Sequence, residues 1–598
     1  MAQRIEDYAL IGDLHTAAMI GKDGSIDWLC LPRFDSAACM AALLGDDGAG
    51  RWKIAPADGG LCASRRYRDH SMILETRWDT PDGSVRVIDL MPPRDDVADI
   101  VRIVEGVSGT VEMRMDLVLR FDYGSIVPWV RQSDGMLEAI AGPDAVWLRT
   151  PVRLVGKDMQ TSATFRVSAG DRVPFVLTYA PSSGPAPRSV DPEAALEGTE
   201  AFWSDWISHA EVTGRWADDI RDSLVVLKAM TYAPTGGLVA AATTSLPEQL
   251  GGPRNWDYRY CWLRDATFTL RALINTGYRE EAHAWRDWLL RAVAGDPADL
   301  QIMYAIDGTR RLTEYEVPWL AGYEGSSPVR VGNAASEQLQ LDVWGEVLDS
   351  LHLSRESGLA TDDHAWDLQR ALLDYLESGW SKNDSGLWES RGPERPYVHS
   401  KVMAWAGMDR AVQAVERFGL DGPVDRWRRT RQEIHDQVVT RGYDADRGTF
   451  TQFYGSEGLD AALLLIPQVG FLPYDDPRVV GTVKAVDREL AQDGFTMRYD
   501  PSADGGADGL PGAEGSFVAC SFWMVNALCE IGEWEEAETR YDRLLSLRND
   551  VGLISEEYDA AAGRQLGNTP QAYSHVGLII GAEHLAGRPG RPLSPERK

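Results

Sequence analysis

The chain has 598 residues, more than one ordinary hydrophobic core supports, so we expect at least two domains. It carries 91 acidic and 60 basic side chains, and the resulting net charge of −31 disfavours nucleic acid and anionic membranes as partners. No apolar run approaches the ~18 residues that a membrane span needs.

Cysteine and histidine patterns give no support to a metal or a cofactor. The six cysteines contain no C-x-x-C pair, so we expect free thiols in a reducing compartment. The ten histidines form no H-x-x-x-H or H-E-x-x-H pair. No basic segment followed by an apolar run opens the chain, so no signal peptide is expected. These patterns predict a cytoplasmic protein and leave open whether it forms a homo-oligomer.

The first third of the chain reads as β-structure. Short runs of alternating hydrophobicity, separated by Gly, Asp and Pro turns, are typical of a sandwich of antiparallel strands. The runs lie at 25–31, 71–78, 84–91, 99–107, 111–121, 145–150, 163–167 and 174–179. Asp23-Gly24 supplies the turn of a hairpin over 21–29. We therefore predict an N-terminal β-sandwich domain, with its Pro/Ser-rich linker, over residues 1–195.

Helical periodicity replaces this pattern after the linker. Twelve segments with apolar residues at three-to-four spacing are expected to be helices. They lie near 219–232, 265–277, 281–294, 334–352, 364–379, 399–418, 424–440, 457–467, 476–492, 516–530, 534–547 and 570–586. Twelve helices could close into an inner and an outer ring of six. We assign them to a second domain at 196–590, followed by a C-terminal tail at 591–598.

Residues 251–270 (GGPRNWDYRYCWLRDATFTL) combine four large aromatic side chains with arginines and aspartates. Flat rings can stack on the apolar faces of a sugar, while forked charges bind its hydroxyl groups. A Trp-rich core with ordinary ion pairs explains the same composition. The stretch alone does not separate the two interpretations.

Two acidic loops could supply a pair of catalytic carboxyl groups. Hydrolysis of an acetal needs one carboxyl group to protonate the leaving oxygen and a second to attack or to activate water. Glu389 follows Trp388 in SGLWESRGP, and Glu556 and Glu557 lie in ISEEYD, each ahead of a predicted helix. A neighbouring tryptophan excludes water from a carboxyl group, which suits a proton donor. The alternative is that these glutamates cap helices or pair with Arg391 and Arg564.

The acidic stretch 500–509 is a weaker candidate. DPSADGGADG lacks the residue order and the closing glutamate of a calcium loop. A solvated loop is therefore the preferred interpretation, and no metal site is predicted.

Taken together, the motifs resemble glycoside hydrolase family 15, the inverting exo-α-glucosidases that include glucoamylases, glucodextranases and a prokaryotic branch of trehalases. The resemblance covers nearly the whole chain. It rests on blocks that follow one another in family order: IEDYALIGDLHTAAMIGKDGSIDWLCLPRFDS, GGPRNWDYRYCWLRDATFTLRAL, LWES, GLDAALLL, GFTMRYD, EGSFVACSFWMVNAL and SEEYD. It implies an (α/α)6 barrel as the catalytic domain and a small saccharide as the substrate.

The resemblance also implies roles for individual residues. Glu389 matches the general acid and Glu556 the general base that activates water. The remaining matched positions would bind substrate: Tyr258, Trp262, Arg264, Asp265, Trp388, Arg498 and Glu557.

One departure bears on the substrate. Fungal glucoamylases have a second glutamate after the acid, where this chain has Ser390. This difference weakens a starch assignment, and VRVGNAASEQLQLDVWGEVLDS looks closest to the trehalase branch. We therefore expect hydrolysis of α,α-trehalose, with release of glucose from maltose, isomaltose or α-glucan ends as the alternative. A sugar-binding protein without catalysis and a phosphorylase of the same fold remain as competing classes.

Overall fold

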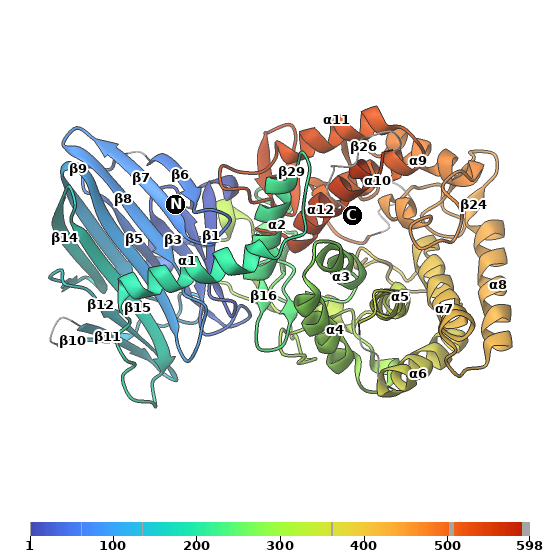
Figure 1. Ribbon diagram of the computed structural model, residues 1–598, viewed down its shortest axis with the longest axis horizontal. Helices are drawn as coiled ribbons and strands as arrows, with labels where there is room; N and C mark the ends of the chain where they lie inside the picture. Colours follow the sequence, from blue (N-terminus) through green and yellow to red (C-terminus); the bar gives the residue numbers. More distant parts are fainter. Residues whose placement is uncertain (1, 61, 134–135, 360–362, 502–507, 589–598) are drawn as a thin grey trace.

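A computed structural model describes residues 2–60, 62–133, 136–359, 363–501 and 508–588. The predicted tail at 591–598 and most of the acidic stretch 500–509 lie outside this range. An antiparallel β part and a helical part lie side by side, and helix α1 runs from one toward the other (Figure 1). The predicted domain boundary at 195/196 falls within α1 (Pro192–Ser208).

The N-terminal part is an antiparallel sheet of 15 strands. The strands are β1 (Tyr8–Gly12), β2 (Ala17–Gly21), β3 (Ser25–Cys30), β4 (Ala38–Met40), β5 (Arg51–Pro56), β6 (Cys62–Tyr67), β7 (Leu74–Thr80), β8 (Gly83–Leu90), β9 (Ala98–Val118), β10 (Trp129–Ser133), β11 (Met136–Ala141), β12 (Asp144–Arg149), β13 (Val155–Lys157), β14 (Gln160–Ser168) and β15 (Arg172–Pro181). The predicted hairpin is present as β2 and β3, with Gly24 at φ +78° in its turn.

Strand β9 connects the two halves of this sheet. Its first half pairs with β8 and β15, and its second half pairs with β5 and β14. The prediction of two strands, at 99–107 and 111–121, was wrong, because the chain does not turn at Gly109 between them. Gly109 instead adopts φ +65° beside β8, where a Cβ atom would lie 2.0 Å from the Asp82 carbonyl oxygen. The strand bulges at Val107, between the pairs Ser84–Ser108 and Val85–Gly106, and continues where a turn was expected.

Helix α1 joins the sheet to the helical part. Its N-terminus is capped by Asp191, whose side chain accepts from the backbone N–H groups of Glu193 and Ala194, and Pro192 opens the first turn. Leu196 packs into a buried cluster with Ile88, Ile103 and other residues of the sheet. The helix therefore covers one sheet face before the chain enters the helical part.

Eleven further α-helices follow in the described residues. They are α2 (Ala217–Ala229), α3 (Ala266–Asn275), α4 (Arg279–Val293), α5 (Asp342–Glu356), α6 (Asp363–Gly379), α7 (Val398–Phe418), α8 (Val424–Arg441), α9 (Pro477–Glu489), α10 (Val518–Glu530), α11 (Trp534–Leu545) and α12 (Ala572–Ala586). The predicted helix at 457–467 is instead a five-residue 3-10 helix, η6 (Ala461–Leu465). Its apolar run is bounded by the capping Asp460 and by Pro467, too short a stretch for a stable α-helix.

Contacts between these elements close into a circuit. Helix α3 packs on α5, α5 on α7, α7 on η6, η6 on α10, α10 on α12, and α12 on α3. Helices α4, α6, α8, α9, α11 and α2 each pack on one or two members of this circuit. Helices α5, α7, α10 and α12 are buried along most of their length, whereas α8 and α11 each bury one stripe.

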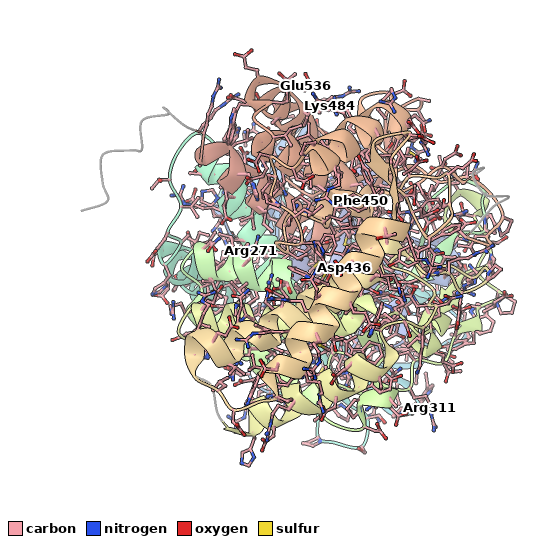
Figure 2. The ribbon with its side chains drawn as sticks, turned by 90° about the vertical axis from the view of Figure 1, so that its right-hand side faces the viewer. Arg271, Arg311, Asp436, Phe450, Lys484 and Glu536 are labelled. Carbon is pink, nitrogen blue, oxygen red and sulfur yellow. The ribbon has the colours of Figure 1, made fainter. Side chains whose placement is uncertain are left out.

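Figure 2 shows the face of the molecule turned away from the sheet, where Asp436 of α8, Lys484 of α9 and Glu536 of α11 lie. In the part of the chain that the structure describes, no helix has both the length and the apolar character needed to cross a bilayer. All six cysteines are free thiols, as predicted.

Candidate active site

A cavity of about 530 Å³ lies among the loops that precede the circuit helices. The lining comes from residues ahead of α3, α5, α7 and α10, where a rigid scaffold commonly positions functional side chains. The lining residues are Glu248, Trp256, Tyr258, Arg264, Asn333, Ala335, Trp388, Glu389, Arg391, Arg498, Tyr499, Leu510 and Phe517.

Glu389 reaches this cavity from a strained backbone. Its φ of +59° lies in the left-handed region, which glutamate rarely adopts and which typically costs ~1–3 kcal/mol. Trp262, in the short strand β20 (Cys261–Trp262), donates from Nε1 to Glu389 Oε1 at 2.7 Å. Arg264 Nη1 donates to the same oxygen at 3.4 Å and to the Leu387 carbonyl at 2.7 Å. The carboxylate is therefore held by two donors from the 251–270 stretch.

Glu556 is buried beside Tyr258. Its Oε2 accepts from the backbone N–H of Asn568 at 3.0 Å, and among the described residues its Oε1 has no hydrogen-bond partner. Burial raises the pKa of Glu556 to about 8, and the charge of Glu248 adds to this effect, while the Tyr258 hydroxyl favours the ionised form. Burial raises the pKa of Tyr258, and the negative charges of Glu556 and Glu389 add to this shift. Tyr258 lines the same cavity as Glu389.

Asp265 lies beside Arg264, at the start of α3. Burial raises the pKa of Asp265 to about 6, and Arg264 opposes the shift. Arg264 Nε and Asp265 Oδ1 are 3.3 Å apart. A guanidinium group and a carboxylate side by side offer both donors and acceptors, the combination that a sugar ring with several hydroxyl groups can use.

Arg498 lies in a group of three buried carboxylates. Glu248, Glu514 and Glu557 bring one oxygen each within 4.8 Å of one another, a spacing that would suit a cation. Arg498 Nη2 faces all three: it donates to Glu248 at 3.2 Å and to Glu514, and lies 3.7 Å from Glu557 Oε1. Arg254 Nη1 also donates to Glu514, at 2.9 Å. The guanidinium groups thus supply the positive charge that a metal ion would otherwise bring.

The indole of Trp388 is held by a hydrogen bond from its N–H group and by ring stacking. Its Nε1 donates to Asp460 Oδ1 at 2.8 Å, and its ring stacks on Trp523 with centroids 5.7 Å apart. The Arg498 guanidinium lies 5.6 Å from its centroid. The indole therefore forms a rigid wall of the cavity.

The structure places the predicted residues in two groups. Five of them line the cavity: Tyr258, Arg264, Trp388, Glu389 and Arg498. The other four lie behind the lining and touch or adjoin it: Trp262, Asp265, Glu556 and Glu557. Glu557 is fully buried in β29 (Glu557–Asp559), and its Oε2 accepts from Gly515 N at 2.8 Å.

Glu389 and Glu556 neither cap the helices that follow them nor pair with Arg391 and Arg564, the alternatives that the sequence left open. Arg391 pairs with Glu314 at 3.0 Å, and Arg564 pairs with Glu324 at 2.7 Å. Sequence reasoning missed Glu248 and Asp460. Glu248 lies in a loop that the sequence marks as Gly-rich and aromatic, and Asp460 precedes an apolar run, but neither signal points to a cavity.

Family models match both parts of the chain. The model described as glycosyl hydrolases family 15 matches residues 218–582, and the model described as trehalase-like, N-terminal, matches residues 1–196. Together they account for most of the sheet and of the helical part.

Individual relatives align along nearly the whole length. A trehalase of Mycolicibacterium smegmatis is 38% identical over 614 residues, covering 97% of this chain and 91% of the relative. A trehalase of Thermoplasma volcanium is 31% identical, covering 97% and 93%. Among solved structures, a bacterial glucoamylase complexed with acarbose superposes with a TM-score of 0.72 at 14% identity, over 98% of this chain and 94% of that one. That likeness establishes a glucoamylase-like fold, and the family model and the relatives together place the chain in glycosyl hydrolase family 15.

Proposed function

We propose that this protein is an inverting exo-acting α-glucosidase and that its substrate is α,α-trehalose. The observation that carries the proposal is that Glu389 and Tyr258 line one cavity, with Glu556 buried beside Tyr258. Inversion needs two carboxyl groups about 6.5–9.5 Å apart, so that a water molecule fits between one of them and the sugar. The assignment to trehalose is supported by the relatives named trehalase, which align with both parts of the chain.

Glu389 is the proton donor in this mechanism. It lines the cavity, and its carboxyl group is aimed by Trp262 and Arg264. It transfers its proton to the glycosidic oxygen as the bond to the anomeric carbon breaks. The strained backbone at Glu389 is the kind of local cost that proteins retain at functional positions.

Glu556 is the base. Its Oε1, which accepts no hydrogen bond from the described residues, is available to accept one from a water molecule, while Asn568 fixes Oε2. The ionised carboxylate removes a proton from that water as it attacks the anomeric carbon from the face opposite the leaving group. The attacked ring leaves as β-glucose and the other ring as α-glucose.

The remaining residues bind the attacked ring. Arg264 and Asp265 hold its hydroxyl groups, and contacts that strengthen as the ring flattens toward an oxocarbenium ion lower the barrier. Tyr258 and Trp388 provide the apolar walls. Arg498 contributes a positive charge that Glu514 and Glu557 hold in place.

The arrangement of the helices supports an (α/α)6 barrel with α3, α5, α7, η6, α10 and α12 on the inside. We assign residues 196–590 to this barrel and residues 1–195 to a sandwich whose two halves share β9. The unpaired cysteines, five of them buried, fit a protein that works in a reducing compartment.

A substrate panel with the purified protein tests the proposal. Trehalose, maltose, isomaltose and maltoheptaose are compared by kcat/KM, and we expect trehalose to be preferred. Proton NMR of the first turnovers should show equal α- and β-glucose from trehalose. Two α-glucose products would mean retention and would refute the water mechanism. A preference for maltoheptaose would indicate a glucoamylase. Formation of glucose 1-phosphate from inorganic phosphate would indicate a phosphorylase. Binding of sugar without hydrolysis would indicate a sugar-binding protein.

A further inference from the structure

Two arginines lie over the indole of Trp256 at the cavity. The Arg391 guanidinium carbon lies 4.5 Å from the ring centroid and that of Arg330 lies 4.6 Å from it. Trp256 Nε1 donates to Glu248 Oε1 at 3.1 Å, which fixes the ring in its own plane. With arginines over the ring, this tryptophan is less able to stack on a sugar, although its sequence context suggested that role.

Glu314 and backbone carbonyls hold the two arginines in place. Arg391 Nη2 donates to Glu314 Oε2 at 3.0 Å, and Arg330 Nε lies 3.9 Å from Glu314 Oε1. Arg330 Nη1 donates to the carbonyls of Pro253 and Asn255 at 2.8 and 3.1 Å. Arg330, Trp256 and Arg391 therefore form a preorganised unit. Planar guanidinium groups stack on aromatic rings and present several N–H donors in a fixed fork.

Side-chain exposure places Arg391 at the mouth of the cavity. The exposed fraction is 13% for Arg264, 18% for Glu389 and 32% for Arg391. An acid at Glu389 protonates the oxygen that joins the two sugar rings. The attacked ring then lies on the buried side, toward Arg264, and the leaving ring lies on the exposed side. Arg391, two residues after Glu389, faces that outer position.

We propose that Arg391, held by Trp256 and Glu314, is a specificity-determining residue that binds the hydroxyl groups of the leaving glucose. This inference rests on the proposed hydrolysis of trehalose and adds the means by which the second ring is recognised. Such a subsite binds the leaving ring by hydrogen bonds to its hydroxyl groups. It gives less support to the further rings of a long glucan, which rely on aromatic stacking.

Kinetics on two substrates test the proposal. α-D-Glucosyl fluoride places only the attacked ring in the cavity, because fluoride replaces the leaving sugar. For Arg391→Ala we expect kcat/KM on trehalose to fall about 10- to 100-fold, the usual effect of losing charge-assisted hydrogen bonds. On glucosyl fluoride it should change less than about threefold. Arg391→Lys should recover little, because an ammonium group cannot reproduce the fork.

Arg311 provides a matched control. It lies at the periphery of the molecule and is exposed (Figure 2). Arg311→Ala removes the same charge and should leave both rates unchanged. Equal losses on the two substrates for Arg391→Ala would show that it supports the Glu389 loop, and no loss on either would place the subsite elsewhere; both results overturn the proposal.

The same experiment separates this inference from the proposed function. A wild-type protein that hydrolyses glucosyl fluoride and another disaccharide, but not trehalose, refutes the substrate assignment. The comparison of Arg391→Ala is then made on that disaccharide, and a selective loss still supports the subsite. A wild-type protein inactive on every substrate refutes the proposed function and the subsite with it.

Discussion

The indole N–H of Trp262 donates a 2.7 Å hydrogen bond to the carboxylate of Glu389. This contact links the stretch at 251–270 to the loop at 385–391, which is 127 residues away in the chain. A hydrogen bond to a charged group is typically worth about 1.5–3 kcal/mol. We expect Trp262→Phe to lower kcat on trehalose at least ~10-fold through misplacement of Glu389. Hydrolysis of glucosyl fluoride needs little protonation of the leaving group, so its kcat should fall less. Equal losses of kcat on the two substrates would contradict this role of Trp262.

Replacing either proposed catalytic glutamate should nearly abolish turnover. Each group of an acid–base pair contributes roughly 10²–10⁴-fold to the rate, so Glu389→Gln and Glu556→Gln should each lower kcat at least ~100-fold. Glu394→Gln, an exposed change in the loop that carries Glu389, is the control and should be neutral. A variant that keeps a tenth of wild-type turnover would remove that residue from the pair.

The pH dependence of kcat/KM should report the ionisation of Glu556. Burial and the charge of Glu248 raise the pKa of Glu556 to about 8, and the base works only when ionised, so activity should rise with pH toward that value. Glu248→Gln removes one of the causes. It should lower the pKa of Glu556 and move the acidic limb of the profile to lower pH. An unmoved limb, or one displaced to higher pH, would show that Glu248 does not control the base.

Arg259 should matter for stability because it joins the two parts of the chain. It is fully buried and pairs with Asp257 at 2.7 Å, and it donates to the Ser36 carbonyl at 2.8 Å and to the Tyr123 hydroxyl at 2.9 Å. Breaking a buried pair typically costs about 3–5 kcal/mol, so Arg259→Met should markedly lower the Tm measured by calorimetry. Tyr123→Phe removes one hydrogen bond to the charged guanidinium and should cost less, about 1.5–3 kcal/mol. A Tm unchanged in Arg259→Met would contradict this anchoring role.

Sequence periodicity predicted elements well where burial is one-sided or continuous. Helix α7 (Val398–Phe418) and strand β8 (Gly83–Leu90) lie where their patterns indicated. It failed where local chemistry was ambiguous: β9 continues through Gly109 with a bulge at Val107, and the apolar run of η6 is too short for an α-helix. Pairing partners that are distant in the chain, such as β5 with β9, have no local signal.

The candidate site shows the same division. Glu389 and Arg264 could be singled out because their motifs are local and specific to a family. Glu248 could not, because its importance comes from Arg498 and Trp256, which lie 250 and 8 residues away in the chain and meet it only in the folded protein. The arginine pair at Trp256 is likewise a product of tertiary packing, since Arg330 comes from the short strand β23 (Arg330–Val331), far along the sequence.

The left-handed backbone at Glu389 has a practical consequence. Asparagine and glycine adopt such a φ more readily than glutamine does. The Glu389→Asn variant should therefore be inactive and should have a higher Tm than the Glu389→Gln variant. The proposed proton donor therefore occupies a position where its backbone conformation is unfavourable. A relaxed, inert version of the loop would be a good trap for capturing the intact disaccharide in a crystal.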